Sequence, residues 1–419
     1  MSTADPATRL YHPVELSSKA FWAKTARERE ESFAILRAEA ALSRQPPVED
    51  PWMPEDIDGY WAIVRHRDIV EVSRRNDVFV SGEGVMFENM PPDMLRGSQS
   101  ILAMDAPEHD KQRKIISAAF TPKQVARLEN QIAASCRNIV DSIAHRGEAD
   151  AVKDIAAELS IRTICNMIGI DRADHPAIGR AAEIITGWND PDIQSDRAAA
   201  LPEIGWYLTK FGRRLAAERR AQPRGDLMSA LANTVVDGQV LNDVGLSSFF
   251  TLLCVAGTDT TRHTVTHTVK ALTDYPQQRA WLAADFDGRI GSAIEEFVRW
   301  ATPVMTFKRT CIRDYELAGQ SIRAGEKVVM FYPSGNWDTT VFTSPDQLDL
   351  ARDPNPHVGF GGGGTHFCLG NQVAKLQLRA LLHELLTRIP DFRAGEPVML
   401  ASNFIHGIKS MPITFTPER

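Results

Sequence analysis

The stretch Phe360-Gly361-Gly362-Gly363-Gly364-Thr365-His366-Phe367-Cys368-Leu369-Gly370 organises this chain, because four consecutive glycines precede a lone cysteine and a helix-patterned run, 371–389, follows it. Glycine lets a backbone approach a ligand closely and adopt positive φ without strain. A cysteine just before a helix start lies near unpaired N–H groups and the positive end of the helix dipole, and both favour thiolate over thiol. The stretch therefore predicts an exposed segment of backbone that presents one cysteine sulfur, stabilised as thiolate, to a flat or large ligand.

Two other interpretations of the stretch stay open at this point. Glycine-rich loops often hold phosphate, but this one lacks the Lys-Ser/Thr of a P-loop and the G-x-G-x-x-G spacing into a helix. A lone cysteine is usually a small, inert, buried hydrophobe. A thiolate ligand on haem iron fits the residues better than either of these, and such a ligand favours O–O cleavage.

The stretch resembles the haem-thiolate loop of the cytochrome P450 family. Most members have a Phe seven residues before the Cys, whereas Phe360 lies eight before Cys368, with an extra glycine. The longer loop is similar to that of bacterial members that oxidise sterols and branched lipids. The resemblance implies one haem b with Cys368 as its axial ligand and with Phe360, Gly361 and His366 among its contacts.

Composition excludes several classes of function. The chain has 419 residues, 43% hydrophobic and 24% charged, as in soluble globular proteins. A net charge of −7 gives no general attraction to nucleic acid. Five scattered cysteines indicate a reducing compartment. We find no signal peptide and no apolar run long enough to span a bilayer, so we expect a cytoplasmic protein.

Helical patterns dominate, with a small β region near each end. We expect helices over 27–42 and 246–272, strands over 60–65 and within 307–331, and an irregular apolar loop over 76–106. By resemblance this is the mainly α cytochrome P450 fold, one α-rich domain around haem over 1–419, and we expect a monomer. The loop over 76–106 would cover the distal face of the haem.

Cationic residues at two places match the haem-propionate contacts of the family. His109 and Arg113 share a helix face, being four residues apart. Alone, this is the pattern of a solvated surface pair, and Arg309 alone is that of a cation at a strand edge. The resemblance implies that these three residues and His366 bind the propionates, for which cations are charge-assisted donors.

The run Ala256-Gly257-Thr258-Asp259-Thr260-Thr261 is poor chemistry for a helix interior. Thr side chains that bond to carbonyls, with Gly beside them, can open and bend a helix. A kink made only for packing is the simpler interpretation. The run resembles the family's oxygen-activating motif, which implies that O₂ lies near Ala256 and Gly257 and that Asp259 and Thr260 deliver protons.

The third match to the family is a structural network of charged residues. Glu296 and Arg299 form an E-x-x-R, which any long chain contains by chance. By resemblance they join Arg352 in a buried network that holds the segment leading into the Cys368 loop.

The candidate pocket is apolar, which suits a lipophilic substrate. Its expected lining residues, besides Ala256, are Met86, Phe87, Leu102, Phe249, Val255, Val304, Met305, Phe307, Phe404 and Ile405. We expect a sterol, terpenoid or branched fatty chain, with hydroxylation of a polyketide or other secondary metabolite as the alternative.

The implied reaction inserts one oxygen atom of O₂ into the substrate. No flavin or iron–sulfur pattern occurs, so electrons must come from NAD(P)H through a separate ferredoxin reductase and ferredoxin. Candidate docking cations are Lys111, Lys114, Lys123, Arg127, Lys375 and Arg379. A non-catalytic haem protein would not need the Asp259–Thr260 pair, and peroxide-driven relatives replace it.

Overall fold

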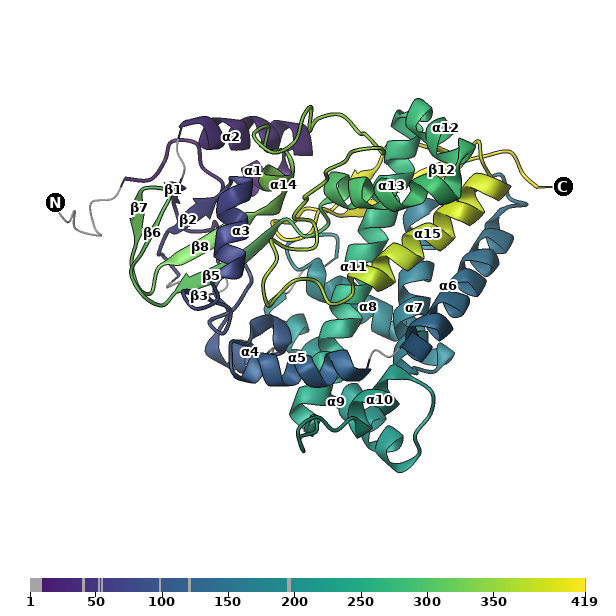
Figure 1. Ribbon diagram of the computed structural model, residues 1–419, viewed down its shortest axis with the longest axis horizontal. Helices are drawn as coiled ribbons and strands as arrows, with labels where there is room; N and C mark the ends of the chain where they lie inside the picture. The colour runs from purple at the N-terminus through teal and green to yellow at the C-terminus, as the bar shows by residue number, and fades with distance from the viewer. Residues whose placement is uncertain are drawn as a thin grey trace.

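The computed structural model describes residues 10–39, 42–51, 53, 56–97, 99–119, 122–193 and 197–418. A sheet and the first helices form one side of the molecule, and packed helices form the other (Figure 1). The long helix α11 (Asp243–Asp274) runs between these two parts, close to the middle of the molecule (Figure 1). This arrangement confirms the expected mainly α fold.

The remaining helices follow chain order. They are α1 (Lys19–Ala23), α2 (Ala26–Glu39), α3 (His66–Arg74), α4 (Pro92–Gly97), α5 (Glu108–Ala119), α6 (Pro122–Ile143), α7 (Glu158–Ile168), α8 (His175–Thr186), α9 (Arg197–Ala221), α10 (Leu227–Asn233), α12 (Pro276–Ala284), α13 (Phe286–Ala301), α14 (Tyr332–Asn336) and α15 (Asn371–Arg388). Short 3₁₀ turns cover Ile101–Ala103 and Arg172–Asp174, and a π-helical segment, Ala151–Ala157, leads into α7.

The strands are short. They are β1 (Leu42–Gln45), β2 (Tyr60–Ile63), β3 (Phe79–Val80), β4 (Glu148–Asp150), β5 (Thr306–Cys311), β6 (Tyr315–Leu317), β7 (Gln320–Ile322), β8 (Lys327–Phe331), β9 (Arg393–Ala394), β10 (Val398–Met399), β11 (Ile408–Ser410) and β12 (Pro412–Thr414). Five of them form one sheet in the order β1-β2-β8-β5-β3, in which β2 and β8 are parallel and the other pairs antiparallel. Smaller sheets join β4-β12-β9, β10-β11 and β6-β7.

Strand β5 positions two of the candidate site residues. Phe307 pairs with Met330 and Arg309 with Val328 on β8. Residues two apart on a strand point to the same face of the sheet. Phe307 and Arg309 therefore share one face of β5, and Lys308 between them takes the other, where its Nζ bonds to Glu83 O and Asn89 Oδ1.

Helix α11 is buried on several sides, against α7, α8, α9 and the π-helical segment. A helix that is enclosed in this way carries apolar or hydroxyl side chains around much of its circumference. An amphipathic surface helix carries its apolar side chains on one face only. Its first turn is capped by Asn242, whose side chain accepts from Gly245 N at 2.8 Å. The predicted helix over 246–272 is thus present and slightly longer at both ends.

Two element predictions need correction. The helix expected over 27–42 ends at Glu39, and Leu42 instead begins β1, where it pairs with Ile63. The loop expected over 76–106 contains β3, α4 and a 3₁₀ turn. Pairing with partners distant in sequence decided β1 and β3, and local periodicity does not show such pairing. Among the described residues, no helix is long and apolar enough to cross a lipid bilayer.

Candidate functional site

One large cavity lies where α11, α7, β5 and the Cys368 loop meet. Its empty volume is about 1630 Å³, including open solvent at its mouth. Thirteen of the sequence-predicted site residues line it: Leu102, Arg113, Phe249, Ala256, Gly257, Thr260, Val304, Phe307, Arg309, Phe360, Gly361, His366 and Cys368. Residues far apart in the sequence therefore converge on one space that can hold a large, flat ligand and a second molecule.

The glycines before Cys368 are required by close packing. Gly362 and Gly364 lie against Ser73 at the end of α3, and an added Cβ would lie 2.4 Å from Ser73 Oγ and 2.5 Å from Ser73 O, respectively. Gly364 also has a φ of +75°, in the region that favours glycine. The loop closes with Cys368 N donating to Phe360 O at 3.0 Å. The backbone thus presents the sulfur to the cavity just before α15 begins.

The sequence argument on the Cys368 sulfur is incomplete. Burial raises the pKa of the Cys368 thiol, while the N–H groups of Gly370 and Asn371 and the charge of Arg113 act to lower it. Burial and these groups therefore act in opposite directions on the Cys368 thiol. A coordinated metal ion would favour the thiolate further.

A group of cationic side chains lies at another part of the cavity wall. The imidazole rings of His109 and His366 are 4.6 Å apart. Arg309 is buried, and its Nη1 donates to Lys308 O at 2.7 Å. Burial, together with the charge of Arg309, His109 and Arg113, lowers the pKa of His366 to about 3. His366 therefore stays neutral and can donate or accept one hydrogen bond.

This group fits the two carboxylates of a haem. His109 Nε2 is buried without a hydrogen-bond partner among the described residues, and no ion pair found in the described ranges joins Arg113 or Arg309 to a carboxylate. Buried guanidinium and imidazole donors need anionic or carbonyl acceptors. The donor set, with Cys368 on the same cavity, is the one expected for haem. His109 itself is not on the cavity wall and contacts it through His366.

The predicted proton-relay residues separate in the structure. Thr260 lines the cavity, and its Oγ1 donates to Ala256 O at 2.7 Å. Asp259 is fully buried and points away from the cavity toward α8, where Thr186 Oγ1 donates to its Oδ2. Arg262 Nη2 lies 2.9 Å from Asp259 Oδ1. Burial raises the pKa of Asp259 to about 6, with Arg262 opposing this and Glu183 adding to it.

Six expected lining residues are placed elsewhere. Phe87 and Met305 belong to a buried cluster with Trp22, Tyr60 and Phe331. Met305 adjoins Val304, which lines the cavity, and successive residues of an extended chain point to opposite sides. Val255 packs with α7 and α9 residues, one helix position away from Ala256. Met86, Phe404 and Ile405 lie behind Val304 and Phe307, one layer outside the cavity wall.

Several lining residues were missed. They include Ile164 and Met167 on α7, Leu252, Leu253, Thr261 and Thr264 on α11, and Tyr332 at the start of α14. The helical period could have identified two of them. Leu252 lies four residues before Ala256, and Thr264 lies four residues after Thr260, so each shares a helix face with a residue that the sequence had predicted. No sequence pattern points to the α7 residues, which come to the cavity by helix packing.

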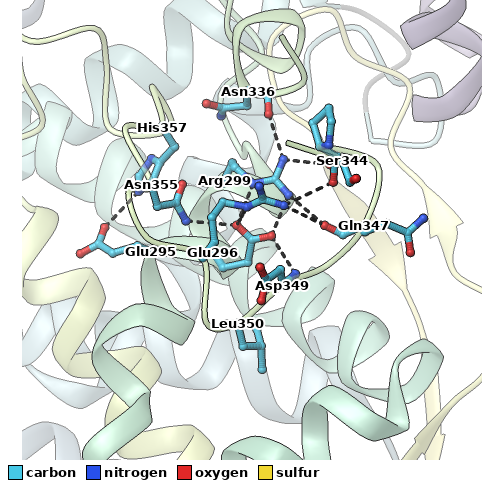
Figure 2. A network of polar contacts seen from close by, with 12 residues as sticks. Glu295, Glu296, Arg299, Asn336, Ser344, Gln347, Asp349, Leu350, Asn355 and His357 are labelled. Carbon is cyan, nitrogen blue, oxygen red and sulfur yellow. Dashed lines mark hydrogen bonds and ion pairs between the residues drawn. The ribbon is translucent and has the colours of Figure 1, made fainter. Parts of the chain in front are cut away.

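Glu296 and Arg299 form a buried ion pair (Figure 2), and Arg352 joins them in a network. Arg299 Nε and Nη2 donate to the two Glu296 oxygens at 2.7 Å each, and Arg352 Nε donates to Glu296 Oε2 at 3.1 Å. Arg299 Nη1 also donates to Asn336 O at 2.9 Å and Pro345 O at 3.0 Å. All three side chains are buried. The network connects α13 to the irregular segment that precedes the Cys368 loop.

The candidate docking cations have internal partners. Lys111 pairs with Glu108, Lys114 with Asp237, Lys375 with Glu295 and Arg379 with Asp287. Arg127 donates to Gly225 O. Lys123 lies in the part of α6 whose side chains the structure does not describe. The cationic patch is therefore mixed with acidic side chains and is less positive than the sequence suggested.

Comparison with known proteins gives consistent results. A family model described as "Cytochrome P450" matches residues 207–389. The chain is 41% identical over 410 residues to a methyl-branched lipid omega-hydroxylase of Mycobacterium tuberculosis, covering 96% of this chain and 95% of that protein. It is 35% identical over 364 residues to a steroid C26-monooxygenase of Mycolicibacterium smegmatis, covering 85% and 84%.

A solved structure is also similar. It is a Mycobacterium marinum cytochrome P450 in complex with pseudoionone, with a TM-score of 0.93 and 55% sequence identity. The match covers 98% of this chain and 100% of that one. Because the match spans the whole length of both chains, it includes the helical part and also the sheet to which β5 belongs.

Proposed function

Because the chain belongs to the cytochrome P450 family, we propose that it hydroxylates a methyl-branched lipid or a steroid side chain at or near its terminal carbon. The chain is an enzyme of the monooxygenase type. The observation that carries the substrate class is the apolar cavity joined to Cys368, together with relatives named for methyl-branched lipids and for C26 of steroids. The reaction consumes R–H, O₂, two electrons and two protons, and yields R–OH and water.

Each candidate residue has a defined part in this proposal. Haem iron, when bound, supplies the reductive activation of O₂. Cys368 would hold the iron through its thiolate sulfur. The haem carboxylates would be bound by Arg113 and Arg309 through charge and by His366 and His109 through hydrogen bonds. The apolar wall excludes bulk water and positions the lipid.

Proton supply depends on two residues of α11. The hydroxyl of Thr260 is at the cavity wall and can pass a proton at its Oγ1. Asp259, one residue earlier, is a buried acid whose raised pKa places its titration close to neutrality. For Asp259 to supply Thr260, its carboxyl group must exchange the Thr186 and Arg262 contacts for one on the cavity side. Electrons would come from a separate ferredoxin and its NAD(P)H-dependent reductase.

The spectrum of the reduced CO complex tests the ligand assignment. Cys368→Ala should abolish the thiolate-type band, because only an anionic sulfur on iron gives that signature. Cys136→Ala is the matched control: Cys136 is fully buried in a cluster around α6, away from the cavity. It should keep the band. A thiolate-type band that survives in the Cys368 variant would contradict the assignment.

Turnover tests the substrate class. A methyl-branched fatty acid and a steroid with an intact side chain are incubated with the enzyme, a ferredoxin, a reductase and NAD(P)H. We expect a hydroxyl group at or beside the terminal carbon, identified by mass spectrometry of the product. Hydroxylation confined to a steroid ring, or no product from either lipid, would contradict the proposal.

A further inference from the structure

Three aromatic rings from distant parts of the chain contact one another in series, and the first of them is on the cavity wall. Phe307 on β5 lines the cavity. The Phe404 ring, in the segment between β10 and β11, lies 5.7 Å from the Phe307 ring. Trp188, between α8 and α9, lies 5.5 Å from Phe404 with its ring plane inclined by 30°. Trp188 thus supports Phe404, and Phe404 supports Phe307.

Phe404 is fixed to the start of β5. Met305 N donates to Phe404 O at 2.8 Å, and Thr306 Oγ1 donates to Asn403 O at 2.9 Å. Val304 and Ile405 form an isolated β-bridge. These backbone contacts make 403–405 an added edge beside 304–306. Phe404 and the cavity-lining residues of this strand therefore keep a constant relative position.

Trp188 is held from a different element. Its loop, 187–193, is joined to the segment around Phe404 by Asp190, a buried carboxylate that accepts from Ala401 N at 2.9 Å. Lys409 Nζ lies 3.1 Å from Asp190. A buried charge is stable only when it is paired and hydrogen-bonded, and both conditions are met only while the loop lies on this segment. The position of Trp188 is therefore set by loop docking.

The indole of Trp188 is held there by stacking and burial rather than by a hydrogen bond. Trp188 is 7% exposed, and its Nε1 has no acceptor within the described part of the chain. Trp22 is buried to the same 7% but donates to Leu16 O at 3.0 Å. Leaving a buried N–H unpaired is unfavourable. The ring contact with Phe404 must outweigh that cost, as expected for a side chain whose function is to support a wall.

We propose that Trp188 is a specificity-determining positioning residue, which limits the length of lipid chain that fits between the reacting position and Phe307 on the cavity wall. This inference rests on the proposed function. When the reacting carbon of the lipid is held near Cys368 and Thr260, the opposite wall of the cavity limits how long the rest of the lipid chain can be. Trp188 does not line the cavity itself and acts through Phe404. Removing the indole leaves the Phe404 ring free to turn away from Phe307 while its backbone stays in place, so that Phe307 can recede and lengthen the space available to the substrate.

The test uses the haem-loaded enzyme and a homologous series of saturated fatty acids. The dissociation constant of each acid is measured by calorimetry in wild type, Trp188→Ala, Trp188→Leu and Trp188→Phe. Trp188→Ala should move the tightest-binding length to longer chains, with affinity gaining about fourfold for each further methylene that the space accepts. Trp188→Leu should move it less. Trp188→Phe, which keeps a stacking ring, should match wild type.

Trp22→Ala is the matched control for the loss of a buried indole. It belongs to a different cluster and should lower thermal stability without changing chain-length preference. The site of hydroxylation gives a second measure: Trp188→Ala should shift product toward carbons nearer the chain end in long acids. Equal length preference in wild type and Trp188→Ala would overturn the inference, as would a shift of the same size in Trp22→Ala.

Failure of this inference can be told apart from failure of the proposed function. A normal thiolate-type CO spectrum and normal fatty-acid binding, with unchanged length preference in Trp188→Ala, would overturn the role of Trp188 alone. If wild type binds no acid of the series, with or without a methyl branch, and no steroid with an intact side chain, the proposed substrate class and the inference that rests on it are both overturned.

Discussion

Asp259 illustrates at the residue scale how burial changes the chemistry of one acid. Its carboxyl group has no solvent contact, and this raises its pKa to about 6 although Arg262 lies 2.9 Å away. A carboxylic acid with that pKa gains a proton as the pH falls through about 6 and loses it as the pH rises. A proton donor must be protonated to act. The structure thus supplies an acid that titrates near the pH at which the enzyme would work.

The first residue-scale prediction concerns coupling. In wild type, the fraction of electrons that ends in product should fall as the pH rises through about 6, because less Asp259 then carries a proton. Asp259→Asn should release more peroxide at every pH and lose this pH dependence. Product and peroxide are measured against NAD(P)H consumed, at constant ionic strength.

Asp274→Asn is the control for this prediction. Asp274 lies on the same helix, is solvent-exposed and pairs with Lys270 at 2.6 Å. Its variant should keep wild-type coupling and pH dependence. A fully coupled Asp259→Asn enzyme would show that protons reach Thr260 by another route.

At the element scale, α13 shows how one buried ion network can hold an irregular segment. Glu296 accepts from Arg299, Arg352, Asn355 and the backbone N–H of Asp349. The segment between α14 and the Cys368 loop has no regular hydrogen-bond ladder of its own, so its carbonyls must find side-chain donors. Arg299 donates to Pro345 O and Arg352 donates to Thr343 O.

The element-scale prediction is a loss of stability and of haem. Glu296→Gln leaves two buried guanidinium groups without their carboxylate, which should cost about 3–5 kcal/mol of unfolding free energy. Because the segment leads into the Cys368 loop, the variant should also contain less haem per chain. Urea unfolding and the haem absorbance of purified protein measure the two effects.

An exposed pair provides the comparison. Glu158 and Arg162 lie one helical turn apart on α7, 2.6 Å from each other, and such pairs contribute only about 0.2–0.5 kcal/mol. Glu158→Gln should therefore leave both measurements close to wild type. A Glu296→Gln protein that is as stable as Glu158→Gln would show that the network contributes specificity of folding and little stability.

At the scale of the whole molecule, charge bears on the electron donor. The chain has a net charge of −7, so an acidic ferredoxin can be attracted only by a local cationic surface. Lys114 follows Arg113, whose Nη2 donates to Phe367 O at 2.7 Å, and Phe367 is 38% exposed. Arg379 lies on α15, the helix that follows Cys368. Their partners Asp237 and Asp287 reduce the local field. We propose docking on this face, with a weaker attraction than free cations would give.

The whole-molecule prediction is kinetic. Replacing both Lys114 and Arg379 by Glu should slow reduction by ferredoxin by about tenfold at low salt and flatten its salt dependence, because exposed charges act mainly on association rate. Lipid affinity should not change, since neither residue lines the cavity. Stopped-flow reduction at several salt concentrations measures the effect.

The control for this prediction reverses one cation far from the proposed docking face. Arg146 follows the end of α6 and pairs with Asp154 at 3.1 Å. Arg388 binds Asp141 near that end of α6, and Arg379 lies nine residues earlier on α15, about 13 Å along the helix axis. That exceeds the screening length of about 8 Å at physiological salt. Arg146→Glu should leave reduction unchanged, and equal slowing by both changes would place the donor elsewhere.

Local chemistry in the sequence determined a large part of this protein. The glycines before Cys368, the hydroxyl-rich run in α11 and the helical periods of α11 and α15 each depend on neighbours within a few residues. Such features are visible in order along the chain. Through the resemblance to the cytochrome P450 family that they carry, they led to the predictions of the fold class, of Thr260, Arg309 and Cys368 as site residues, and of the Glu296 network.

Tertiary structure decided what depends on distant partners. The sequence could not show that Asp259 faces Thr186, that Phe87 and Met305 pack away from the cavity, or that Ile164 lines it. Nor could it show that burial raises the pKa of the Cys368 thiol while the neighbouring N–H groups and Arg113 lower it. Side-chain direction and dielectric environment are set by which elements pack together. For this reason the chain encodes which residues serve the site locally, while packing alone fixes their orientation and pKa.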